Sequence, residues 1–158
     1  MKDYIRPINR LLVANRGEIA IRIMRAATEL GITTVAVYTY EDRYSLHRYK
    51  ADEAYQIGRD DEPLKPYLDV EGIILLAKSK KIDAIHPGYG FLSENVNLAR
   101  RCREEGIIFI GPTPEAMEAL GDKVRAKNLA TIAEVPLIPD SREENMSAER
   151  ASEEAARI

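Results

Sequence analysis

The chain has 158 residues, of which 45% are hydrophobic and 31% are charged, a balance typical of a globular domain with its own core. A formal net charge of -3 gives no basic footprint for nucleic acid, and no apolar run approaches the roughly 20 residues that span a bilayer, so we expect neither partner. The only cysteine, Cys102, excludes an internal disulfide and fits a reducing compartment, so we expect a cytoplasmic protein.

Short apolar or β-branched runs alternate with segments of helical periodicity along the chain. In order, the patterns predict a strand at 10–14, a helix at 18–30, strands at 33–39 and 54–57, a helix to residue 80, a strand at 82–85, a helix to residue 105, a strand at 107–110, and helices from 114 and from 122 to 132. Asp69, Ser93 and Asp122 are the expected N-caps, and Gly31 and Gly106 are the expected stops. The apolar stripe of the first helix is expected to consist of Ile19, Ile23, Ala26 or Ala27, and Leu30.

Strands that alternate with helices predict right-handed βαβ units and the α/β class: a Rossmann-like, doubly wound, mostly parallel sheet. Ligands bind such sheets at the carboxyl ends of the strands. Residues 15–17 and 86–93 both follow predicted strands, so we expect a site to involve these two loops. The first loop has a single glycine, Gly17, and lacks the Gly-x-Gly-x-x-Gly pattern of dinucleotide binders, so Arg16 is interpreted as a surface or interface charge.

The loop HPGYGFLSEN, residues 86–95, combines features that a packing loop does not need. Gly88 and Gly90 leave room on both sides of Tyr89, and a helix N-terminus is expected to follow. One interpretation is a loop that faces a ligand. The other is a capped connection in which Tyr89 packs on a neighbour and His86 bonds to the backbone.

Two charged features are also ambiguous from the residues alone. One face of the first helix, which is either solvated or an oligomer contact, carries Glu18, Arg22, Arg25 and Glu29. Lys123 stands at the first position of a helix, where its charge opposes the helix dipole, which suggests a phosphate partner. The histidines and the cysteine are scattered, so no metal site is predicted.

The last segment, residues 136–158, differs from the rest of the chain. It is highly charged, and its only apolar stripe consists of Ala148, Ala151, Ala155 and Ile158. We therefore expect one domain at 1–135, followed by a helical linker at 136–158 that leads to a domain absent from this chain.

Seven stretches in this order resemble the N-terminal (preATP-grasp) domain of biotin carboxylase: LLVANRGEIAIRI, ELGITTVAVY, KADEAYQIG, YLDVEGII, DAIHPGYGFLSEN, GIIFIGP and GDKVRAK. They cover most of residues 10–139. Two segments, SLHRYKADEAY and RRCREEGIIFIGP, are most similar to the pyruvate carboxylases. Residues 140–143 depart from the glycine-containing loop of the family.

The resemblance implies a parent ligase that uses MgATP and bicarbonate to carboxylate biotin on a carrier domain. It implies that Lys123 binds ATP, that Tyr89 and Gly90 line the pocket for the biotin ureido ring, and that Glu94 helps to shape this pocket.

The resemblance also implies a homodimer interface at Arg22, Arg25 and Glu29. The family's catalytic residues and Mg²⁺ ligands lie beyond residue 158. The expected partners are therefore the ATP-grasp half of the same enzyme and the biotin carrier domain, and this chain is expected to be inactive alone and to hold no cofactor tightly. The alternatives are a biotin carboxylase subunit of an acetyl-CoA or propionyl-CoA carboxylase, and a non-catalytic dimerisation module.

Overall fold

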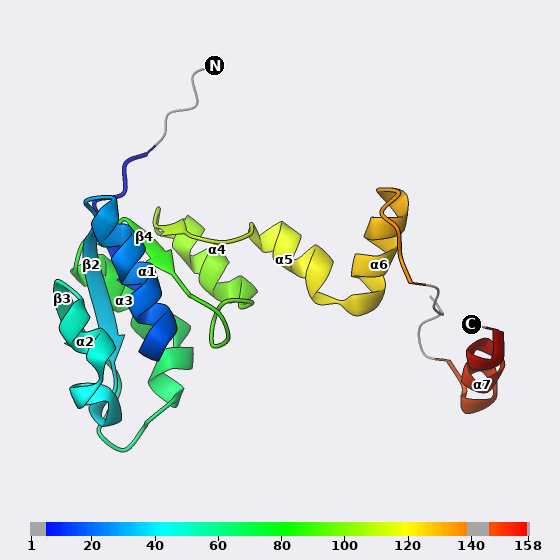
Figure 1. Ribbon diagram of the computed structural model, residues 1–158, viewed down its shortest axis with the longest axis horizontal. Helices are drawn as coiled ribbons and strands as arrows, with labels where there is room; N and C mark the ends of the chain where they lie inside the picture. The colour runs from blue at the N-terminus through cyan, green and yellow to red at the C-terminus, as the bar shows by residue number, and fades with distance from the viewer. Residues whose placement is uncertain (1–5, 139–145, 158) are drawn as a thin grey trace. The chain divides into compact units, whose positions relative to one another are not determined.

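The computed structural model describes residues 6–138 and 146–157 (Figure 1). The chain divides into two compact units, residues 1–114 and 115–158. The elements of the first unit are β1 (Arg10–Val13), α1 (Gly17–Glu29), β2 (Thr33–Tyr38), the 3-10 helix η1 (Tyr40–Tyr44), α2 (Leu46–Lys50), β3 (Glu53–Gln56), the 3-10 helix η2 (Lys65–Leu68), α3 (Val70–Ser79), β4 (Ala84–His86), α4 (Val96–Glu104) and β5 (Ile108–Phe109). Helix α5 (Pro114–Gly121) begins at the boundary, and the second unit continues with α6 (Lys123–Ile132) and α7 (Ala148–Arg157).

The five strands form one parallel sheet in the order β3-β2-β1-β4-β5. Alternate residues of each strand face opposite sides, as the two-residue period of a strand requires. Leu12, Val35 and Ile85 pack with α3 and α4 on one face, whereas Leu11 and Val13 pack with α1 on the other. Helices on both faces confirm the predicted doubly wound α/β class.

Helix α1 buries Ile23 and Ala27 as predicted, but the rest of its buried stripe differs from the prediction. Its buried residues are Ala20, Ile23, Met24 and Ala27. Leu30, which we expected to be buried, is 76% exposed. The reason is that the helix ends at Glu29 and Gly31 follows with a φ of +73°, so the chain leaves the helical period before Leu30 can continue the stripe.

The start of α4 also differs from the prediction. Ser93 is not the N-cap, because its backbone N–H donates to Gly90 in a turn. The cap is Asn95, whose side-chain oxygen accepts a hydrogen bond from the Leu98 N–H at 3.0 Å. Ser93 and Asn95 both satisfy the sequence rule for a cap, but Ser93 belongs to the turn at the end of the loop. Asp69 and Asp122 cap α3 and α6 as predicted.

The polar stretch between β2 and β3 had no predicted element, yet it contains η1 and α2. In the second unit, Glu154 of α7 is buried between Arg150 and Arg157, whereas Ala148, Ala151 and Ala155 are exposed. The predicted stripe residue Ile158 and the departure at 140–143 lie outside the described residues. The boundary expected between residues 135 and 136 stays a prediction. Among the helices described here, none has the length and hydrophobicity to cross a membrane.

Candidate functional site

The candidate site lies where β1 and β4 end side by side in the sheet. Connections leave these two neighbouring strands toward opposite sheet edges, and such a switch point is where open α/β sheets bind ligands. The turn after β1 and the loop after β4 enclose a pocket of about 410 Å³. Its lining residues are Asn15, Arg16, Gly17, Glu18, Ile19, Tyr89, Gly90 and Phe91.

The loop after β4 has a backbone that only certain residues tolerate. Gly88 and Gly90 have φ values of +70° and +64°, a region in which side chains are strained, and Phe91 follows at +42°. The Phe91 ring stacks on the buried ring of Tyr67, with 5.2 Å between centroids. This contact holds the far end of the loop while Tyr89 stays 65% exposed.

The contacts of this loop agree with the capped-connection interpretation at His86 but not at Tyr89. His86 does bond to the backbone, because its Nδ1 accepts a hydrogen bond from the Gly88 N–H at 3.0 Å. Burial lowers the pKa of His86, which favours the neutral ring that this hydrogen bond needs. Tyr89, in contrast, is exposed and lines the pocket, as the ligand-facing interpretation requires.

Asn15 joins the two sides of the pocket. Its side-chain amide nitrogen donates to the carbonyl oxygens of Pro87 at 2.6 Å and Tyr89 at 2.9 Å. Its oxygen accepts from the Arg16 N–H at 2.9 Å. The side chain is buried directly after β1, so the turn and the loop are tied together beneath the pocket.

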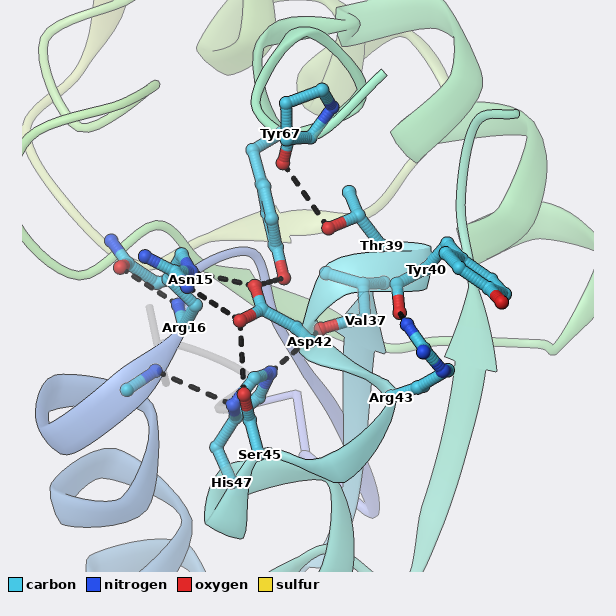
Figure 2. Close-up of polar contacts among 12 residues, drawn as sticks. Asn15, Arg16, Val37, Thr39, Tyr40, Asp42, Arg43, Ser45, His47 and Tyr67 are labelled. Atoms are coloured by element: carbon cyan, nitrogen blue, oxygen red, sulfur yellow. Dashed lines mark hydrogen bonds and ion pairs between the residues drawn. The ribbon is translucent and has the colours of Figure 1, made fainter. Parts of the chain in front are cut away.

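Arg16 is an exposed charge, as predicted, with 44% of its side chain exposed, but a buried carboxylate anchors it. Figure 2 shows Arg16, Tyr67 and Ser45 converging on Asp42, whose side chain is only 5% exposed. Arg16 Nε donates at 2.6 Å, the Tyr67 hydroxyl at 2.7 Å and the Ser45 hydroxyl at 2.9 Å. The turn after β1 directs Arg16 toward η1, where its guanidinium forms an ion pair with Asp42.

These donors determine the charge of Asp42. Burial acts to raise its pKa, but the hydrogen bonds from Arg16, Tyr67 and Ser45 outweigh burial and lower the pKa to about 2. Conversely, burial and then the hydrogen bond to Asp42 raise the pKa of Tyr67. The cluster is therefore an ionised carboxylate with a neutral phenol and a guanidinium.

His47 supports the turn from α2 (Figure 2). Its Nδ1 accepts from the Gly17 N–H at 3.4 Å, and its Nε2 lies 3.2 Å from the Val37 carbonyl oxygen. A carbonyl accepts only, so Nε2 carries the proton and Nδ1 is free to accept, which describes a neutral ring. Burial lowers the pKa of His47, in agreement with this assignment.

The structure brings Tyr89 and Gly90 together in the pocket, but the pocket lining in the described part of the chain does not include Glu94, which is exposed. Lys123 lies in the second unit, exposed at the start of α6 behind the Asp122 cap.

The other predicted residues lie on α1. Arg22, Arg25 and Glu29 form an exposed face there, with Arg25 Nε 3.7 Å from the Glu29 carboxylate. Sequence reasoning placed Asn15 in a predicted site loop without giving it a role, and it assigned no role to Asp42 or His47. A polar residue placed directly after a buried strand was the available signal for Asn15. Within the described residues, no group of three His, Cys, Asp or Glu side chains is arranged to hold a metal ion.

Comparison with known proteins identifies the fold family. Residues 7–117 match the family described as biotin carboxylase, N-terminal domain. The chain belongs to this family. It is 63% identical over 134 residues to pyruvate carboxylase from Bacillus subtilis, an alignment that covers 85% of this chain and 12% of that protein.

Two solved structures share the biotin carboxylase fold with this chain. The pyruvate carboxylase of Rhizobium etli matches with a TM-score of 0.80 and 51% identity, over 84% of this chain and 13% of that one. The biotin carboxylase domain dimer of the Hydrogenobacter thermophilus 2-oxoglutarate carboxylase, in complex with MgADP, ADP and bicarbonate, matches with a TM-score of 0.89 and 47% identity, over 97% of this chain and 33% of that one. The chain thus spans about an eighth of the pyruvate carboxylases and a third of an isolated biotin carboxylase domain.

Proposed function

We propose that this chain forms the first domain of the biotin carboxylase component of a pyruvate carboxylase. The observation that carries the proposal is the pocket at the switch point, which brings the exposed Tyr89 and the glycine at position 90 together beside the turn after β1. The identity to pyruvate carboxylases favours them over acyl-CoA carboxylases as the parent. A cytoplasmic location is part of the proposal, supported by the buried free thiol of Cys102.

In the proposed parent reaction, bicarbonate attacks the γ-phosphorus of ATP and forms carboxyphosphate with release of ADP. Carboxyphosphate would then yield phosphate and CO2; biotin would accept the CO2 at N1, and the released phosphate would take the N1 proton. Bound Mg²⁺ would neutralise phosphate charge during the transfer from ATP. None of these bond changes is assigned to a residue of this chain, which we propose to be inactive by itself.

The role we propose for this domain is to bind and orient. Tyr89 and Gly90 form one wall for the ureido ring, because the absence of a side chain at position 90 lets a flat ring approach the backbone. Glu94 acts from the periphery of the same loop. Lys123 reaches a phosphate of ATP, and its exposure at the start of α6 is compatible with that role.

We also propose that the parent is a homodimer that uses the face of Arg22, Arg25 and Glu29. The match to a structure of a biotin carboxylase domain dimer supports this part of the proposal. The exposed cations and carboxylate are self-complementary, as a two-fold interface requires. Arg25→Glu in the full-length enzyme should lower its mass in sedimentation by half, and an unchanged mass would contradict this interface.

The pocket assignment is tested with Tyr89→Ala in the full-length carboxylase and free biotin as substrate. We expect the KM for biotin to rise about tenfold while the KM for ATP stays unchanged, because only the ureido wall is removed. Tyr49→Ala is the matched control, since Tyr49 is also exposed but lies outside the pocket. An unchanged KM for biotin in the Tyr89 variant would refute the assignment.

A further inference from the structure

We propose that Asn15 is a positioning residue: its side chain sets the orientation of the loop that carries Tyr89 and Gly90. The loop forms one wall of the pocket, and the Asn15 side chain donates hydrogen bonds to two backbone carbonyl groups of this loop. The part of this inference that concerns biotin rests on the proposed function.

The hydrogen bonds of Asn15 leave a single arrangement of its amide. The nitrogen faces two carbonyl oxygens, those of Pro87 and Tyr89, and the oxygen faces the Arg16 N–H. If the amide were flipped, its oxygen would face two acceptors and its nitrogen would face a donor. Because Asn15 is also 97% buried from solvent, at 3% exposure, water cannot replace these partners.

The two carbonyl groups that Asn15 binds, those of Pro87 and Tyr89, lie on either side of the Gly88–Tyr89 segment and set its orientation. A peptide group is planar, so a fixed Tyr89 carbonyl also fixes the direction of the Gly90 N–H in the same plane. The Pro87 carbonyl fixes the plane that contains the Gly88 N–H in the same way, and that N–H donates to His86. Asn15 therefore holds the peptide planes at both ends of the Gly88–Tyr89 segment, where the glycines would otherwise allow rotation.

The packing around Asn15 is as restrictive as its hydrogen bonds. A Cβ atom added at Gly88 would lie 2.7 Å from the Asn15 amide nitrogen, closer than real contacts allow. The glycine at position 88 is thus required both by its φ of +70° and by the approach of Asn15. The loop therefore lies too close to the amide for any residue larger than glycine at position 88.

The test is Asn15→Asp, which preserves shape but places a carboxylate oxygen against the two carbonyls. In the chain itself, we expect faster hydrogen exchange at Gly88, Tyr89 and Gly90 than in the wild type. In the full-length carboxylase, we expect the KM for free biotin to rise about tenfold, because two buried hydrogen bonds are lost. Bicarbonate-dependent ATP cleavage without biotin, and the KM for ATP, should stay within about twofold.

Asn95→Asp is the matched control. The same chemical change at the cap of α4 keeps the acceptor for the Leu98 N–H, so exchange in the loop and the KM for biotin should both stay at wild-type values. If Asn15→Asp does not fold, Asn15→Ser provides the same measurements with a smaller, uncharged side chain that cannot reach both carbonyls.

Each outcome decides the inference. Unchanged loop exchange and an unchanged KM for biotin in a folded Asn15 variant would overturn it. An equal rise in the KM for ATP would also overturn it, because this would indicate general loss of structure. Faster loop exchange in Asn15→Asp, combined with no effect of Tyr89→Ala on the KM for biotin, would support the positioning role and instead refute the proposed biotin pocket.

Discussion

Asp42→Asn removes the buried charge that anchors Arg16 and leaves the shape of the side chain almost intact. The pKa of Asp42 is lowered from 3.8 to about 2 in the folded chain, a difference that corresponds to about 2 kcal/mol of stability at neutral pH. The hydrogen bonds from Arg16 and Tyr67 also weaken when their acceptor is neutral. We expect the free energy of unfolding to fall by roughly 2–4 kcal/mol.

The sign of the pH dependence follows from the direction of the shift. Because the folded pKa of Asp42 is lower than the unfolded one, its contribution is complete above 3.8 and is lost as the pH falls toward 2. Urea unfolding across this range should therefore show a smaller loss of stability in Asp42→Asn than in the wild type. The chain has no tryptophan, so far-ultraviolet circular dichroism is the suitable signal.

The control is Asp61→Asn, which makes the same change at an exposed loop position and should alter stability by no more than about 0.5 kcal/mol. The reasoning would be refuted if Asp42→Asn unfolded at the wild-type urea concentration and with the wild-type response to acid. Such a result would mean that solvent screens the Arg16–Asp42 pair despite its burial.

Three further outcomes follow from other parts of the molecule. Asn95→Ala should lower the free energy of unfolding by about 1 kcal/mol and Ser93→Ala by no more than about half as much, since only Asn95 caps α4; equal losses in urea titrations would contradict the assigned cap. Cys102 is buried and burial raises the pKa of its thiol to about 12, so a thiol reagent such as Ellman's should modify it only after unfolding; rapid labelling of the folded chain would contradict this. Burial lowers the pKa of His47 below 6.5, so the neutral ring contributes its full stability above pH 6.5, and this contribution is lost as the pH falls through the folded pKa. In an NMR titration the ring should therefore have a midpoint below 6.5, and a midpoint above 6.5 would contradict the assignment of a neutral ring.

The fold class was predictable because alternating apolar runs and helical periods depend on local sequence. The strands β1, β2 and β4 and the glycines at 31 and 106 are each recognisable without knowledge of the rest of the chain. The helical segment from residue 40 to 50 was not, because its conformation depends on tertiary partners. Asp42 and His47, which look like ordinary polar residues of a loop, are buried against Arg16, Tyr67 and Val37.

Some residues of the candidate site were predictable from local sequence, and others were not. Tyr89 and Gly90 were predictable because two glycines around an aromatic residue are unusual after a strand. Asn15 was not, because its role depends on carbonyl groups 72 and 74 positions further along the chain. Glu94 lies outside the pocket lining, and α4 begins only at Val96; local spacing predicted neither detail.

The pairing of β1 with β4 has a consequence for the order of folding. Val13 and His86 are paired in the sheet although β2 and β3 lie between them in the chain. Closure of such a long crossover is slow compared with the formation of helices or hairpins. The pocket therefore has no local precursor: residues from both the turn after β1 and the loop after β4 line it, so it should appear during refolding only when these two strands pair.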